Sequence, residues 1–219
     1  MYDVNSLSGL ISRKKCTILG IGPMSKNCVD VTINLANRYN TPLMLIASRR
    51  QIETKELGGG YVNNWTTEEF IKYVHEKDVK KNIILCRDHG GPFQGNNEKE
   101  QKLTLVEAMK NAKVSFLADI KAGFKILHID PSENLQKEID IDKMLERIYE
   151  LYDFCCTAAK ENKKQVFFEI SIGKEDGEVH RFEEINYAIS KIENFCLQRN
   201  LPKPTFIVTK TGNYVMETK

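Results

Sequence analysis

Short apolar runs alternate with amphipathic helical patterns along the whole chain. The runs at residues 16–22, 43–48, 82–87, 125–129, 165–170 and 205–209 are nearly continuous in hydrophobic residues. Such runs are typical of parallel strands that are buried on both faces. Between them, residues 29–39, 66–76, 103–122, 142–161 and 182–199 carry apolar side chains at helical spacing. The alternation predicts an α/β protein with about six βα units around a parallel sheet.

Two helical segments carry specific expectations. In residues 29–39, the side chains of Val29, Ile33, Leu35 and Ala36 are expected near one face. At the start of residues 66–76, a threonine precedes a glutamate by three positions, which is the spacing of a capping box at a helix N-terminus.

The number of units leaves two architectures open. Six units fit a doubly wound open sheet, and they also fit a TIM-type (β/α) barrel that is incomplete. A complete barrel usually needs roughly 250 residues, and this chain of 219 residues suits one domain, residues 1–219. In both architectures, functional residues collect just after the carboxyl ends of the strands.

Composition and charge narrow the classes of partner. Lysine and arginine total 32 against 30 acidic residues, and there is no basic stripe with interleaved aromatics, so we expect no nucleic-acid partner. No apolar run approaches the roughly 18 residues that cross a membrane, and residues 1–5 lack the order of a secretory signal. The six cysteines form no CxxC pair. We therefore expect a cytoplasmic protein with reduced, mostly buried thiols and no membrane partner.

The loop after the second predicted strand is a candidate for ligand binding. Arg49, Arg50 and Gln51 follow that strand, and a glycine run that includes Gly59 and Gly60 comes next. Arginine can hold a phosphate or carboxylate through two hydrogen bonds, and glycines let backbone amides approach a ligand closely. The same residues also suit a flexible loop whose arginines pair with acidic neighbours.

The third predicted strand ends in an Asp-His pair. Asp88 and His89 are followed by Gly90, Gly91 and Pro92. Adjacent side chains at a strand end point to opposite sides unless the backbone turns, and we expect the Gly-Gly-Pro segment to supply that turn. A histidine at such a place can bind a metal, and the carboxylate beside it can act as general acid or base. Many Asp-His pairs are only turn caps, so the position after a buried strand is what favours function.

Polar residues also mark the fourth and fifth strands. His128 and Asp130 lie on the same face by alternation, and Ser132 follows them. His128 is either a core histidine bonded to a backbone carbonyl or a ligand-binding residue. Glu169 falls inside an apolar run, where a carboxylate is costly unless it is paired or functional. It is the most informative single residue of the chain.

Three segments, taken in order, resemble the tagatose-bisphosphate aldolase accessory subunits of the GatZ/KbaZ type. They are residues 47–61, which contain Ala-Ser-Arg-Arg-Gln-Ile and Gly-Gly-Gly-Tyr, residues 88–92 (Asp-His-Gly-Gly-Pro), and residues 122–130 (Ala-Gly-Phe-Lys-Ile-Leu-His-Ile-Asp). The resemblance covers most of the chain, which is shorter than full-length members. It implies a TIM-type barrel, a sugar-phosphate ligand and kinship with zinc-dependent class II aldolases.

The resemblance also implies roles for individual residues. Asp88 would be the proton-transfer carboxylate and His89 a ligand of Zn²⁺. Glu169 would be a second catalytic carboxylate, and Glu175, in the acidic loop that follows, a second metal ligand. A bound Zn²⁺ would polarise a ketose carbonyl and stabilise the enediolate left by carbon–carbon cleavage. The expected substrate-binding residues are Arg49, Gln51, Gly59, Gly60, Asp130 and Ser132.

The chain also departs from catalytic relatives. Such relatives take further histidine ligands from the sixth strand and beyond, whereas residues 206–214 contain no histidine. Their phosphate-binding glycine loops lie mainly in later strands that are missing here. We therefore favour a non-catalytic or accessory subunit that supports a catalytic aldolase. The alternatives are a metal-dependent lyase or isomerase acting on a sugar phosphate, and a fragment or one piece of a split barrel whose missing strands come from a partner chain. The expected protein partner is a catalytic aldolase subunit or further copies of this chain in a homo-oligomer.

Overall fold

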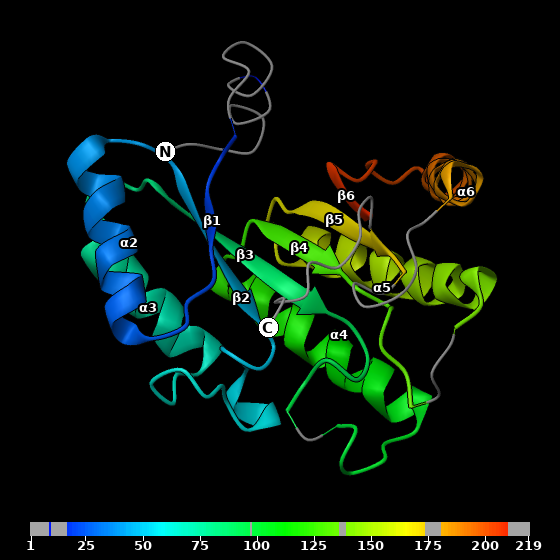
Figure 1. Ribbon diagram of the computed structural model, residues 1–219, viewed down its shortest axis with the longest axis horizontal. Helices are drawn as coiled ribbons and strands as arrows, with labels where there is room; N and C mark the ends of the chain where they lie inside the picture. The colour runs from blue at the N-terminus through cyan, green and yellow to red at the C-terminus, as the bar shows by residue number, and fades with distance from the viewer. Residues whose placement is uncertain (1–8, 10–16, 97, 136–138, 174–180, 210–219) are drawn as a thin grey trace, which may run out of the picture.

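Six strands form one parallel sheet in which every strand pairs with its neighbour in the chain (Figure 1). The computed structural model describes residue 9 and residues 17–96, 98–135, 139–173 and 181–209. The strands are β1 (Gly20–Ile21), β2 (Leu43–Ser48), β3 (Ile83–Gly90), β4 (Ile126–Ile129), β5 (Phe167–Ile172) and β6 (Phe206–Thr209). A doubly wound sheet reverses its strand order at a switch point, whereas a barrel wall grows in one direction. The order β1 to β6 is therefore that of a six-stranded half-barrel, as the barrel alternative predicted.

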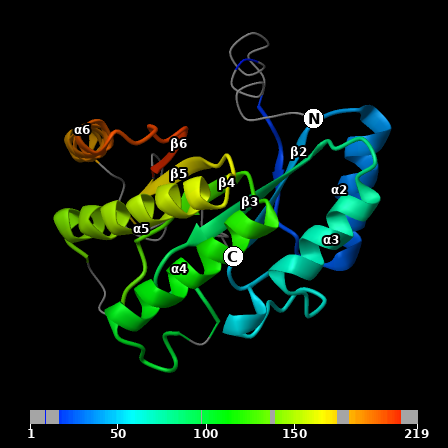
Figure 2. The same cartoon turned by 180° about the vertical axis from the view of Figure 1, so that it is seen from behind.

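Helices cover one face of this sheet. Figures 1 and 2 show α2 to α5 on the same side of the strands. The helices are α2 (Lys26–Tyr39), α3 (Thr67–Lys77), α4 (Leu105–Ala122), α5 (Ile141–Glu161) and α6 (Phe182–Arg199), with a short 3-10 turn η1 (Lys55–Leu57). The large apolar core lies between them and the sheet. A second, small apolar cluster around Ile84, Cys86 and Ile126 lies apart from this core. Residues of both clusters alternate along the strands, so the strands are apolar on both faces, as expected.

Local signals account for most helix boundaries. Thr66 and Glu69 form the predicted capping box, in which each side chain accepts a hydrogen bond from the other residue's backbone amide. One expectation for α2 is wrong, because Leu35 is exposed and Thr32 is buried in its place. At about 100° per residue, Thr32 lies within the stripe defined by Val29 and the residues one turn later, and Leu35 lies outside it.

Most strand boundaries differ from the expected ones by one to four residues. β5 begins and ends two residues later than the expected run 165–170. β1 is only two residues long within the described part of the chain, and Cys16 lies outside that part. β3 continues to Gly90, three residues past the expected end, because Gly90 still pairs with Ile129 of β4. Within the described residues, β1 and β6 each pair on one side only. Whether a partner chain covers these edges stays a prediction.

A buried ion pair that the sequence did not reveal joins β3 to α4. Arg87 donates from Nε and Nη2 to the two carboxylate oxygens of Asp119, at 2.7 Å and 2.6 Å. Its Nη1 donates to the carbonyl oxygens of Ala47 and Ile52, at 2.9 Å and 2.8 Å. Both charged side chains are fully buried. The guanidinium thus holds the loop after β2 against β3, which positions the two loops that follow these strands.

The five cysteines within the described residues are free thiols, and Cys86, Cys155 and Cys196 are buried. Burial raises the pKa of the Cys86 and Cys155 thiols well above their ordinary value. Among the helices that the structure describes, none has the length and hydrophobicity to cross a bilayer.

Candidate functional site

A β-bulge at the end of β3 brings the side chains of Asp88 and His89 close to each other. Arg87 pairs with Leu127 and Gly90 pairs with Ile129, so three steps along β3 oppose two steps along β4. His89 takes the extra position with a φ of 45°, which few non-glycine residues adopt. Its Nε2 lies 3.7 Å from Oδ2 of Asp88. The backbone therefore turns at His89, earlier than the expected Gly-Gly-Pro turn.

Two glycines let the end of β3 pack directly on the end of β4. A Cβ at Gly90 would lie 2.5 Å from the ring of Phe116 and 2.6 Å from the carbonyl oxygen of His128. A Cβ at Gly91 would lie 1.8 Å from the carbonyl oxygen of Asp130. All three contacts are far too short for a Cβ atom, so only glycine fits at these two positions. The glycines thus explain how the residues after β3 and β4 come within hydrogen-bond distance of one another.

Asp130 is the buried centre of these contacts. Its Oδ2 lies 2.7 Å from Nδ1 of His89 and accepts a 2.6 Å hydrogen bond from Nε2 of Gln94. Its Oδ1 accepts a 3.0 Å hydrogen bond from the backbone amide of Ser132. Burial alone would raise the pKa of Asp130, but the hydrogen bonds from His89 and Ser132 and the charge of His128 outweigh it. The net pKa lies below its ordinary value, so the carboxylate stays ionised.

Asp88 holds the second histidine. The amide of His89 lies 3.0 Å from Oδ1 of Asp88 and 3.3 Å from Nδ1 of His128, and the shorter contact indicates donation to the carboxylate. Nδ1–H of His128 is then available to donate to the same Oδ1, at 3.2 Å. Burial opposes ionisation of Asp88, yet these contacts lower its pKa overall. A carboxylate, rather than the backbone carbonyl considered above, therefore holds the ring of His128.

The other ring nitrogen of His128 is open. Nε2 is buried and has no hydrogen-bond partner within the described residues. His128 pairs in register with Glu169 of β5. Burial raises the pKa of Glu169 more than the nearby histidines lower it, and the like charge of Asp88 adds to the increase. The site thus combines two carboxylates that stay ionised with one that holds its proton to higher pH, a contrast typical of acid–base sites.

These five residues, Asp88, His89, His128, Asp130 and Glu169, form what we call the strand-mouth cluster. Four of them were expected to meet at the carboxyl ends of the strands, and the structure brings them together with His128. Gln94 was not anticipated. The sequence could have indicated Gln94 by its position, because it lies in the polar loop that follows β3, and such loops carry the functional residues of a barrel.

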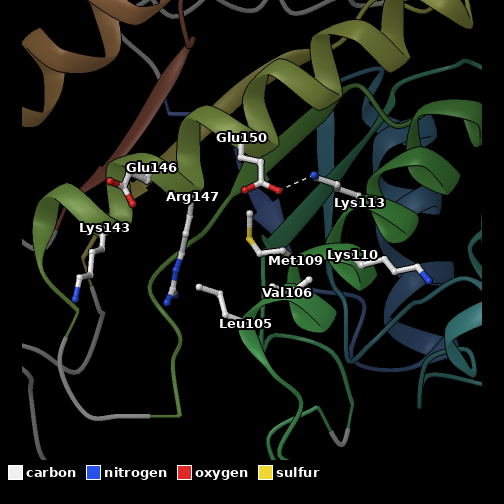
Figure 3. Close-up of a pocket in the computed structure, with 9 residues that line it drawn as sticks. All are labelled: Leu105, Val106, Met109, Lys110, Lys113, Lys143, Glu146, Arg147 and Glu150. Atoms are coloured by element: carbon white, nitrogen blue, oxygen red, sulfur yellow. Dashed lines mark hydrogen bonds and ion pairs between the residues drawn. The ribbon is translucent and has the colours of Figure 1, made fainter.

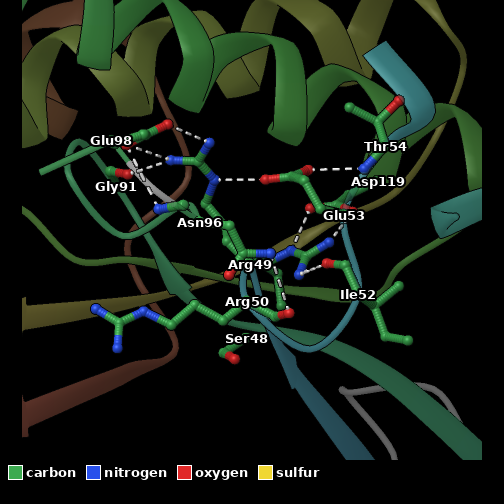
Figure 4. Close-up of polar contacts among 12 residues, drawn as sticks. Ser48, Arg49, Arg50, Ile52, Glu53, Thr54, Gly91, Asn96, Glu98 and Asp119 are labelled. Atoms are coloured by element: carbon green, nitrogen blue, oxygen red, sulfur yellow. Dashed lines mark hydrogen bonds and ion pairs between the residues drawn. The ribbon is translucent and has the colours of Figure 1, made fainter. Parts of the chain in front are cut away.

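Arg49 does not join the strand-mouth cluster. Its guanidinium is only 1% exposed and donates to Glu53 at 2.7 Å, to Glu98 at 2.7 Å and to the carbonyl oxygen of Gly91 at 2.7 Å (Figure 4). These contacts tie the loop after β2 to the loop after β3. In this structure Arg49 therefore positions Gly91 and pairs with acidic residues, which is the second of the two roles that the sequence left open for it.

The other expected substrate-binding residues are also engaged within the protein. Gln51 accepts a 2.9 Å hydrogen bond from the amide of Ser48. A Cβ at Gly60 would lie 2.0 Å from the carbonyl oxygen of Gln51, so this glycine permits close backbone packing. Gly59, with a φ of 72°, lines a polar cleft of about 580 Å³ beside Glu98. Ser132 contributes its amide to Asp130, and Glu175 lies outside the described residues.

The described residues do not fit a zinc site on their own. Three or four His, Cys or carboxylate donors normally surround such an ion. In the part of the chain that the structure describes, no group of three such side chains has an arrangement that could hold a metal ion. His89 and His128 each direct a ring nitrogen at an aspartate. We therefore derive no metal-dependent step from this site.

Two solved structures share the fold of this half-barrel. A fructose-bisphosphate aldolase from Campylobacter jejuni matches with a TM-score of 0.59 and 15% identity over 99% of this chain and 58% of its own. A probable tagatose 6 phosphate kinase from Sinorhizobium meliloti 1021 matches with a TM-score of 0.68 and 22% identity over 89% of this chain and 49% of its own. At these identities the likeness shows the fold alone. The chain spans roughly half the length of these relatives.

The family follows from a match along the sequence. The family model described as D-tagatose-1,6-bisphosphate aldolase subunit GatZ/KbaZ-like matches residues 10–175, which include the whole strand-mouth cluster. The protein belongs to this GatZ/KbaZ-like family. The resemblance carried by the three segments of the sequence is thereby confirmed.

Proposed function

We propose that this protein is an accessory subunit of a tagatose-bisphosphate aldolase that binds a sugar phosphate at the strand-mouth cluster without cleaving it alone. The observation that carries the proposal is the mutual pairing of histidines and aspartates. His89 contacts Asp130 at 2.7 Å and His128 contacts Asp88 at 3.2 Å. The family's description as an aldolase subunit supports the accessory role.

The paired cluster suits the recognition of hydroxyl groups. Ionised Asp88 and Asp130 are hydrogen-bond acceptors, and the raised pKa of Glu169 lets that carboxyl keep its proton, and with it a donor, to a higher pH than a free glutamate. A few convergent polar groups at the mouth of a barrel are the usual way of orienting a small polar ligand. The side chains of Asp88 and His89 are about one third exposed, at 32% and 31%, so a ligand can reach them. Sugar hydroxyls match this mixture of donors and acceptors.

A metal-dependent lyase is the second candidate, with Asp88 as acid or base and His89 as a metal ligand. The observation in its favour is Nε2 of His128, a buried polar atom without a partner in the described residues. In this alternative, Nε2 of His128 would hold a further ligand. The two candidates differ in whether the chain alone cleaves a sugar bisphosphate.

Cleavage of D-tagatose 1,6-bisphosphate tests the proposal. The rate is measured for a catalytic aldolase subunit alone, for this protein alone with added zinc, and for the two together. We expect no zinc-dependent cleavage by this protein alone and a higher rate or longer half-life for the mixture. Zinc-dependent cleavage by the protein alone, lost in Asp88→Asn and kept in the surface control Glu100→Gln, would instead establish the lyase.

A further inference from the structure

A cleft on the outer side of the half-barrel, between α4 and α5, is separate from the strand-mouth cluster. It has a volume of about 480 Å³, within the range of small-molecule pockets. We call it the α4–α5 cleft, and Figure 3 shows its lining. Apolar side chains come from α4, and basic side chains come from both helices. The residues used below are Leu105, Val106, Met109, Lys110, Lys143 and Arg147.

Arg147 is a buried cation that has no carboxylate partner among the described residues. It is 7% exposed, and its Nη1 donates to the carbonyl oxygens of Pro131 and Glu133, at 3.2 Å and 3.0 Å. Its Nη2 donates to Oδ1 of Asn134 at 3.4 Å. All three acceptors are neutral, and Nε is buried with no partner in the described residues. Burial accordingly lowers the pKa of Arg147.

The other two arginines that are this deeply buried make the contrast clear. Arg49 pairs with two glutamates and Arg87 pairs with an aspartate. A buried guanidinium normally needs such a partner, because its desolvation is otherwise uncompensated. Within the described part of the chain, Arg147 therefore has no counterpart to the carboxylates that pair with Arg49 and Arg87.

The remaining charges of the cleft are also mainly positive. Lys110, Lys113, Lys143 and Arg147 line it together with two carboxylates, Glu146 and Glu150, which leaves a net charge of +2. Lys113 and Glu150 neutralise each other in a 2.6 Å ion pair. Val106, which is 79% exposed, lies beside these charges and adds an apolar surface.

We propose that the α4–α5 cleft binds a small organic anion, with its charged group against Arg147 and Lys143 and its apolar part over Val106 and Met109. A phosphate ester and a carboxylate share the required chemistry. Arg147 also holds the carbonyls of the loop that begins at Asp130. The anion therefore stabilises the loop that supports the strand-mouth cluster. This inference does not depend on the proposed function.

Site-resolved lysine acetylation, read by mass spectrometry, tests the inference on the full chain. Phenyl phosphate and benzoate serve as separate probes, and chloride at equal ionic strength is the reference. We expect a probe to protect Lys143, on α5, and to leave unprotected Lys121, an exposed residue at the C-terminal end of α4. Protection by one probe or by both identifies the anionic group and supports the site.

Variants complete the test. Lys143→Gln should weaken binding of the effective probe about tenfold, the usual effect of losing one charge-assisted hydrogen bond. The matched change Lys121→Gln should leave the affinity unaltered. Equal protection of Lys121 and Lys143, no protection by either probe, or unchanged affinity in Lys143→Gln would overturn the inference. Because Lys143→Gln leaves Arg147 and its loop contacts in place, a folding defect does not obscure the result.

Discussion

Nδ1 of His89 and Oδ2 of Asp130 lie 2.7 Å apart and join the carboxyl ends of β3 and β4. The contact exists because the bulge turns His89 toward β4 and because Gly91 lets the two backbones touch. Asp130 receives two further hydrogen bonds, from Gln94 and Ser132. This carboxylate is therefore the residue on which the geometry of the strand-mouth cluster most depends.

Asp130→Asn should weaken both the fold and ligand binding. The amide keeps an acceptor for Ser132 but loses the charge that pairs with His89. We expect a loss of about 1–3 kcal/mol in the free energy of unfolding and weaker binding of D-tagatose 1,6-bisphosphate. Urea unfolding and calorimetric titration measure the two effects, with Glu100→Gln as an exposed control. Wild-type values for both quantities would show that Asp130 does not organise the site.

Gly91→Ala should disrupt the strand-mouth cluster more than an equivalent change at Gly58. The new Cβ would meet the carbonyl oxygen of Asp130 at 1.8 Å, so the ends of β3 and β4 must separate. At Gly58, with a φ of 94°, nothing lies within 4 Å of the added carbon, and only backbone strain of about 1 kcal/mol is expected. Comparing the unfolding free energies of the two variants isolates the steric effect. Equal losses would contradict the close packing at Gly91.

Because Arg87 and Asp119 form a buried ion pair, we expect substitutions of the two residues to have non-additive effects on the free energy of unfolding. Asp119→Leu leaves a buried guanidinium without its carboxylate and should cost about 3–5 kcal/mol. Adding Arg87→Met should recover part of that loss, since apolar residues of similar size replace both charges. Urea unfolding of the two single variants and the double variant measures the coupling. Additive losses would show that the two side chains do not interact.

The lowered pKa of Asp30 predicts that the stability of the protein depends on pH in the acid range. Hydrogen bonds from Lys26 and Tyr73 lower the pKa of Asp30 from 3.8 to about 2. A folded pKa below the unfolded one gives stability that is present above pH 4 and is lost as the pH falls toward 2. Asp30→Asn should therefore flatten the acid side of the stability profile over this window. An unchanged slope, with Glu100→Gln as control, would contradict the role of these contacts.

Much of the fold was predictable because each strand is a short apolar run bounded by polar residues. Leu43–Ser48 and Phe182–Arg199 have the expected bounds, and the Thr66–Glu69 capping box is a local signal read directly. The order of the strands in the sheet was not predictable, since six βα units suit two architectures. That choice depends on pairing between distant strands.

The site was predictable only in part for a similar reason. Asp88, Asp130 and Glu169 were identified by their position at or near strand ends. The left-handed turn at His89 depends on the register between β3 and β4, which no single segment determines. Arg49 looked like a ligand-binding residue because its partner Glu98 is 49 positions away in the chain. Long-range pairing thus decides which charged residues remain free for a ligand.

Calorimetric titration of D-tagatose 1,6-bisphosphate into this protein, in EDTA and then with zinc, tests the central claim most directly. If the paired histidines and aspartates form the ligand site, binding is saturable in EDTA, has the same affinity with zinc and is weakened in Asp130→Asn. Binding that occurs only with zinc, or that Asp130→Asn leaves unchanged, would contradict the account.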